Sequence, residues 1–108
     1  MNYSKAYLIT YNRLFSMTTS KLLEIALISN NKFLEDIAIR ILIDDNRLLN
    51  IDKPISLNLL IDKLSIEDIW YLSTLNTDSL IAKLAKEKVI NIIDNTFYHE
   101  KKILYLTK

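Results

Sequence analysis

The sequence predicts one mainly α-helical domain, residues 1–108, that ends in a C-terminal β-hairpin. Half of the residues are hydrophobic, which is typical of a packed globule and not of a disordered chain. Apolar residues recur at intervals of three and four through most of residues 4–88, the spacing of helices with one buried face. Two runs rich in β-branched residues, 89–93 and 103–107, flank a polar segment and indicate paired strands.

The first half of the chain predicts three helices, over residues 4–17, 21–29 and 32–44. The segment Thr18-Thr19-Ser20 offers N-cap side chains for the second helix, and Asn30-Asn31 marks its end. The third helix stops at Asp44-Asp45-Asn46. Residues 48–51 form either a short strand or a buried loop, because the apolar run is too short to decide.

The second half predicts three further helices and the hairpin. Ser56 is the expected N-cap of a helix over 57–64, and Ser65 caps a helix over 66–73. A third helix follows, which starts between Thr77 and Ser79 and ends at residue 88. The hairpin pairs 89–93 with 103–107 around the loop 94–101, although both runs also fit a pair of helices. Residues 1–45 are thus N-terminal helices, and 55–108 form a second part of the same domain.

Missing residue types exclude several classes of function. Without cysteine there are no disulfides, thiolate zinc sites, iron–sulfur clusters or cysteine nucleophiles. Without glycine there are no phosphate-binding loops, dinucleotide turns or glycine-flanked nucleophile elbows. Ten asparagines are expected to occupy the left-handed backbone positions that glycine usually fills. We expect no cofactor and no enzymatic activity.

Charge and hydropathy point to a protein of the cytoplasm without a membrane segment. The formal net charge is +1, which neither indicates nor excludes a nucleic-acid partner. No apolar segment reaches the roughly 18–20 residues of a membrane span. The N-terminus lacks the basic start and the cleavage site of a signal peptide.

Candidate chemistry outside a binding role is weak. The acidic pairs Glu35-Asp36 and Asp44-Asp45, together with Asp52, suggest a metal-dependent nuclease, but neighbouring carboxylates on a helix diverge and Asp is common at helix ends. A single histidine excludes a multi-histidine metal site and suggests no catalytic triad. We expect no metal site and no catalytic residue, and place Trp70 and Tyr71 in or beside the core.

The order of elements after residue 55 resembles the winged helix-turn-helix of bacterial regulators. Residues 65–72 match the positioning helix and 77–88 the recognition helix, held together by apolar residues between 69 and 84. The continuation into a polar loop and the closing Leu106-Thr107-Lys108 is similar to the multiple-antibiotic-resistance and staphylococcal accessory regulator families. This resemblance implies a sequence-specific DNA-binding protein that controls transcription in a bacterium, phage or archaeal virus.

The resemblance also implies how double-stranded DNA is bound. The recognition helix supplies base contacts and phosphate-binding lysines, and the hairpin loop flanks the groove. The implied DNA-binding residues are Thr77, Ser79, Ala82, Lys83, Lys86, Tyr98, His99, Lys101 and Lys102. The alternative for these lysines is an ordinary solvated helix face, with Lys83 and Glu87 as an i,i+4 pair.

An aromatic stripe on the first helix suggests a homodimer. Its residues either cover the domain's own core or pair with a copy across a two-fold axis, as in dimeric DNA-binding proteins. The predicted interface residues are Tyr3, Tyr7, Tyr11, Leu14 and Phe15.

A second interpretation starts from an internal repeat of 47 residues. The offset aligns Thr18 with Ser65, Leu22 with Ile69 and Ala38 with Ala85, and further apolar pairs follow: Ile25 with Leu72, Ile28 with Leu75, Phe33 with Leu80, Ile37 with Leu84 and Leu42 with Val89. A period of this length resembles the helical repeats of the HEAT and armadillo families. This interpretation implies an all-α chain of helical hairpins that binds a protein partner, as an adaptor or an inhibitor.

Overall fold

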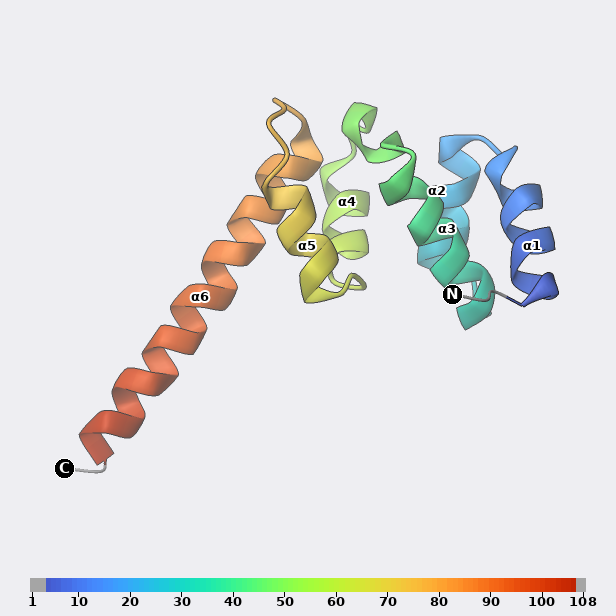
Figure 1. Ribbon diagram of the computed structural model, residues 1–108. Helices are drawn as coiled ribbons and strands as arrows, with labels where there is room; N and C mark the ends of the chain where they lie inside the picture. Colours follow the sequence, from blue (N-terminus) through green and yellow to red (C-terminus); the bar gives the residue numbers. More distant parts are fainter. Residues whose placement is uncertain (1–3, 107–108) are drawn as a thin grey trace.

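The computed structural model describes the backbone of residues 4–106 and the side chains of residues 4–96 (Figure 1). The principal extents of 57, 32 and 25 Å describe an elongated molecule. Helix α6 runs away from the other helices at one end (Figure 1). In chain order the elements are α1 (Lys5–Phe15), α2 (Thr19–Ile28), α3 (Lys32–Asp44), the 3₁₀-helix η1 (Arg47–Asn50), α4 (Pro54–Ile61), α5 (Ile66–Ser73) and α6 (Leu80–Leu106).

The predicted C-terminal β-hairpin is wrong, and with it the winged helix-turn-helix fold. Residues 80–106 form one continuous helix that includes the predicted loop 94–101, and residues 4–106 contain no strand. Val89, Ile92 and Ile93 are spaced three and four residues apart, so their apolar side chains also suit one helix face. The predicted loop contains neither glycine nor proline to interrupt a helix. The all-helical alternative fits the structure.

Side-chain caps set most helix starts. Thr18 and Ser65 each accept a hydrogen bond from the backbone N–H three residues on, which confirms both as N-caps of α2 and α5. Asn31 caps α3 through the N–H groups of Phe33 and Leu34. Ser56 is not a cap, because α4 begins two residues earlier at Pro54, whose fixed φ suits a first helical position.

The chain reverses between α3 and α4 through a left-handed residue. Asn46 has φ 53° and is the only residue with positive φ that the structure describes, so asparagine replaces glycine at one such position and not at ten. For residues 48–51 the sequence allowed either a short strand or a buried loop. Most of this segment forms the 3₁₀-helix η1, and Leu48 is buried.

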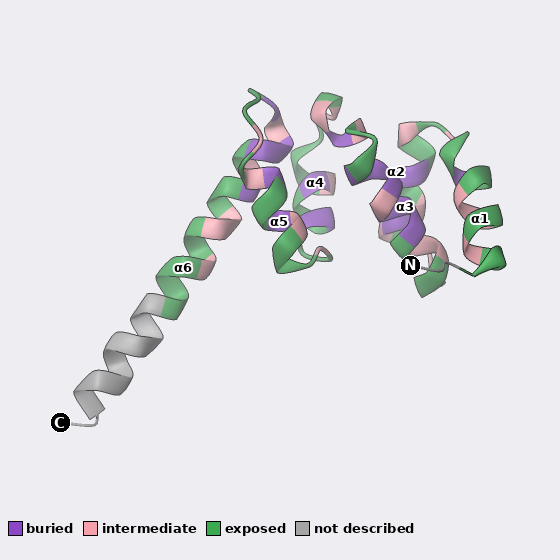
Figure 2. Ribbon diagram, in the orientation of Figure 1, coloured by how far each residue is buried: buried purple, intermediate pink, exposed green. Residues whose placement is uncertain are grey.

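One hydrophobic core runs through all seven elements (Figure 2). Its members are almost all aliphatic, and α3 contributes the most of them. The largest side chains that are fully buried are Leu22, Ile37, Ile41, Leu42, Leu48, Leu57, Leu60, Leu72 and Ile81.

The predicted offset of 47 residues relates the helices in two sets of three. Helices α1, α2 and α3 form a first unit, and α4, α5 and α6 form a second, with α2–α3 and α5–α6 making the largest helix contacts. Ala38 and Ala85 are both fully buried where each pair meets, and Leu14 and Ile61 are buried near the ends of α1 and α4. These two pairs of equivalent positions are therefore buried in both units.

Polar contacts join the two units. The Arg40 guanidinium on α3 donates to Asp68 on α5 at 2.9 Å. After α4, Lys63 reaches back to the Glu35 carboxylate at 3.1 Å and to the Ala26 carbonyl at 3.1 Å. These contacts fix the second unit on the first and so position the outer face of α5 and α6.

Candidate functional site

An apolar groove lies on the outer face of α5 and α6. It encloses about 180 Å³ and exposes no polar surface. Three of its side chains are largely open to solvent: Ile66 is 68% exposed, Trp70 57% and Ile93 54%. We call this surface the α5–α6 groove; its lining residues are Ile66, Ile69, Trp70, Val89, Ile92 and Ile93.

In the first unit, half of the equivalent positions are polar (Thr19, Asp45 and Asn46), and the apolar ones (Leu22, Leu23 and Leu42) are buried. The offset of 47 residues pairs Ile69 with Leu22 and Trp70 with Leu23, which are 0% and 6% exposed. Helix α4 packs against α2, and η1 packs against α3. The second unit therefore exposes apolar side chains at Ile66, Trp70 and Ile93, where the first unit has a buried leucine or a polar residue.

The two units also differ in where their last helix stops. Helix α3 ends at Asp44, and the turn through Asn46 sends η1 and α4 back over α2 and α3. The equivalent positions in α6 are Asn91 and Ile93, where the helix continues. Helix α6 thus continues beyond the groove, and its residues Ile92 and Ile93 line the groove.

The DNA-binding residues expected in the recognition helix occupy different environments. Ala82 is fully buried and Ser79 is 9% exposed, so neither side chain projects from the surface of α6. Thr77 is exposed and shares a 2.7 Å hydrogen bond with Ser79. Lys83 pairs with Asp78 at 3.1 Å, and Lys86 is exposed.

The residues expected in the wing lie along the same helix, not on a separate hairpin. The backbone of residues 98–102 continues α6, at a rise of about 1.5 Å per residue beyond Lys86. The side chains of Tyr98, His99, Lys101 and Lys102 lie outside the described residues.

The aromatic stripe of α1 contacts the chain itself. Leu14 is buried, and Tyr7 packs edge-on against Phe33 of α3 with ring centroids 6.3 Å apart. Tyr11 stacks between Tyr7 and Phe15, each at 6.1 Å. Tyr3 lies outside the described residues. The stripe therefore serves the core of the first unit, and its predicted role between two copies stays a prediction.

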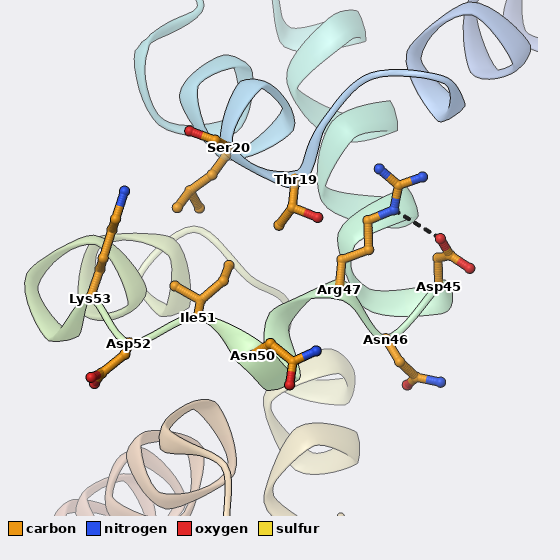
Figure 3. A pocket seen from close by; sticks show the side chains of 10 residues that line it. Thr19, Ser20, Asp45, Asn46, Arg47, Asn50, Ile51, Asp52 and Lys53 are labelled. Carbon is orange, nitrogen blue, oxygen red and sulfur yellow. Dashed lines mark hydrogen bonds and ion pairs between the residues drawn. The ribbon is translucent and has the colours of Figure 1, made fainter.

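A larger, polar pocket of about 580 Å³ lies where η1 meets the start of α2 (Figure 3). Its one arginine is used within the chain: Arg47 donates to Asp45 at 2.8 Å and to the carbonyls of Met17 and Phe15 at 2.6 and 2.7 Å. The guanidinium also lies 5.1 Å from the centre of the Phe15 ring. These contacts hold the α1–α2 turn against η1.

The acidic pairs considered for a nuclease take part in ion pairs. Glu35, Asp36, Asp44 and Asp45 each lie within 4 Å of a lysine or arginine nitrogen, and no cluster among the described residues could hold a metal ion. Burial lowers the pKa of Arg40, but its hydrogen bond to Asp68 and the charges of Asp68, Asp44 and Tyr7 outweigh this and raise the pKa overall. Arg40 is thus a permanent cation between α3 and α5.

The main surface feature that the sequence did not predict is the exposure of Trp70. Helical spacing placed it in or beside the core, and only the uncovered groove shows why it lies at the surface. None of the described helices has both the length and the low charge needed to cross a membrane. Comparison with protein families, with curated proteins and with solved structures found no match.

Proposed function

We propose that the chain is a helical protein-interaction module that binds an amphipathic α-helix in the α5–α6 groove. The supporting observation is the contrast between Leu23, which is buried, and Trp70, which has the same position in the second unit and is open to solvent. A helix that presents an apolar stripe to a hydrophobic groove is a common mode of peptide recognition. Exposed aromatic residues are also frequent centres of protein interfaces.

The chemistry of the partner follows from what covers the first unit. Helix α4 buries Leu57, Leu60 and Ile61, spaced three and one residues apart. A partner helix with aliphatic residues at similar spacing complements Ile66, Trp70 and Ile93. The groove lining offers no polar side chain, so aliphatic contact dominates the recognition.

The DNA-binding alternative has less support because the wing it relied on is helical. Lys83 is paired with Asp78, and Lys88 lies 3.4 Å from Asp62, so two of the lysines on α6 already have acidic neighbours. Two of the expected base-contacting residues, Ser79 and Ala82, are buried. A protein partner instead needs only the α5–α6 groove, where Ile66, Trp70 and Ile93 are exposed to solvent.

The intrinsic fluorescence of the chain tests this proposal directly. Trp70 is the only tryptophan and lies in the groove. The probe is a synthetic peptide of residues 47–64, which carries η1 and α4 and contains no tryptophan or tyrosine. Saturable binding with a shift of the Trp70 emission to shorter wavelength is the expected result, because docking removes water from the indole.

Two controls make the result specific. A peptide with Leu57→Glu and Leu60→Glu keeps the length but loses the apolar stripe, and should not shift the emission. In the chain, Ile93→Glu should abolish binding, whereas Ile55→Glu, at a residue 78% exposed on α4, should leave it unchanged. An emission spectrum that stays constant up to millimolar peptide would refute the proposal.

A further inference from the structure

We infer that the partner at the α5–α6 groove is a second copy of this chain, held groove to groove across a two-fold axis. This inference rests on the proposed function and names its occupant. Leu22 and Leu23, at the positions of Ile69 and Trp70, are buried in the first unit, so helices of this chain can bury side chains at these positions. A two-fold contact needs one self-complementary patch, which both copies supply.

Helix α1 lacks the pair of leucines that α4 buries. In α4, Leu57 and Leu60 are fully buried, and the offset of 47 residues pairs them with Thr10 and Arg13 of α1. Arg13 is exposed. Copies therefore cannot repeat, head to tail, the leucine contacts that α4 makes, whereas a two-fold contact between two grooves needs no second surface.

The exposed apolar area is large enough for such a contact. At about 200 Å² for a fully exposed large side chain, the exposed parts of the groove residues Ile66, Trp70 and Ile93 amount to about 350 Å². This lies within the roughly 300–600 Å² of the largest apolar patch on a typical monomer, which is often functional. It is about half of the ~800 Å² that each partner contributes to a standard interface, and a polar rim supplies the rest.

The geometry of α6 also favours a second copy. From Ile90 to Thr96 only Ile92 is partly buried, so this part of the helix has little of its own chain to pack against. Helices in proteins gain most of their stability from packing one apolar face. In a two-fold pair, each α6 gives the other copy's α6 and α5 that packing.

Sedimentation velocity of the full chain from about 1 to 300 µM tests the inference. The expected result is a concentration-dependent rise from the 12.6 kDa monomer to a species of twice that mass. Ile93→Glu should remain monomeric at every concentration, and Ile55→Glu should dimerise like the natural chain. Circular dichroism of both variants shows whether each keeps its helical content.

The outcomes separate this inference from the proposed function. A natural chain that stays monomeric to 300 µM, while the 47–64 peptide still shifts the Trp70 emission, overturns the second copy and leaves the groove to another protein. A natural chain that stays monomeric, and whose Trp70 emission does not change with the peptide, overturns both the second copy and the proposed function. A dimer that persists in Ile93→Glu places the contact elsewhere, such as the α1 stripe, and a mass that grows without limit indicates head-to-tail stacking; each of these also overturns the inference.

Discussion

Leu23 and Trp70 hold the same position in two successive helical units, and one is 6% exposed while the other is 57% exposed. Leu23 is the fifth residue of α2 and Trp70 is the fifth residue of α5, and the two helices begin after equivalent caps, Thr18 and Ser65. The segments that follow the two helical pairs also differ, because η1 and α4 pack back on α3 and α2, whereas α6 continues as one helix. Burial here is decided by topology, since the local helix is the same.

The two residues should differ in what they contribute to stability. Leu23→Ala removes a core side chain and should lower the free energy of unfolding by about 2–4 kcal/mol. Trp70→Ala removes a larger side chain that is mainly in contact with water, and should cost about 1 kcal/mol or less in the monomer. Urea unfolding followed by circular dichroism at low micromolar concentration measures both. Equal losses would show that the groove is closed in solution.

The polar face of α1 should prevent open-ended assembly. Thr10→Leu with Arg13→Leu gives α1 the leucines that α4 carries at Leu57 and Leu60, so a head-to-tail contact becomes available. Light scattering should then show a mass that increases steadily with concentration. Asn12→Leu is the matched control, because its equivalent Leu59 is exposed and not one of the leucines that α4 buries. Identical scattering from the double variant and the control would contradict the prediction.

The ion pair between Arg40 and Asp68 should stabilise the junction of the two units. Asp68→Ala leaves the half-buried Arg40 guanidinium without its 2.9 Å acceptor and should cost about 1–2 kcal/mol. Asp36→Ala breaks an exposed pair with Lys32 within α3, which solvent screens, and should leave the free energy of unfolding nearly unchanged. Thermal and urea unfolding of both variants check the contrast. A loss from Asp36→Ala as large as that from Asp68→Ala would argue against it.

Arg47 should not be replaceable by lysine. Its three nitrogens donate to three separate acceptors, the Asp45 carboxylate and two carbonyls of the α1–α2 turn. Lysine keeps the charge but cannot reach these acceptors in the same fork geometry. Arg47→Lys should therefore lower the free energy of unfolding by about 1–3 kcal/mol. Arg13→Lys, at an exposed position of α1, is the control and should be nearly neutral.

The left-handed turn at Asn46 should distinguish glycine from alanine. Asn46→Gly suits φ 53° and should leave stability nearly unchanged, whereas Asn46→Ala should cost about 1 kcal/mol. Since this turn returns η1 and α4 onto the first unit, the alanine variant should also show faster amide hydrogen exchange in η1. Equal stability of the two variants would show that residue 46 leaves the left-handed region in solution.

The sequence predicts the helices whose ends carry strong side-chain signals. The bounds of α3 and α5 follow from Asn31, Asp44 and Ser65, and the repeat is visible in apolar spacing alone. The start of α4 was misplaced because Ser56 competes with Pro54, and proline at the first helical position is the stronger signal here.

The error at the C-terminus has a physical cause. β-branched residues favour strands only where a sheet surface receives them, so the run 89–93 carries no strand preference of its own. Its residues Val89, Ile92 and Ile93 pack toward α5 instead. The exposure of Trp70 could not be predicted from local pattern, because it depends on where α6 goes after the position at which α3 stops.

The extensive contacts of the fold join elements that are at most three apart in chain order. Little chain has to be closed into loops before stabilising contacts form, so the entropic barrier to folding is small. Helical proteins with such local connectivity fold in microseconds to milliseconds. The two helical pairs with the most extensive contacts, α2 with α3 and α5 with α6, are each formed by neighbouring segments of the chain and need the shortest loops to close.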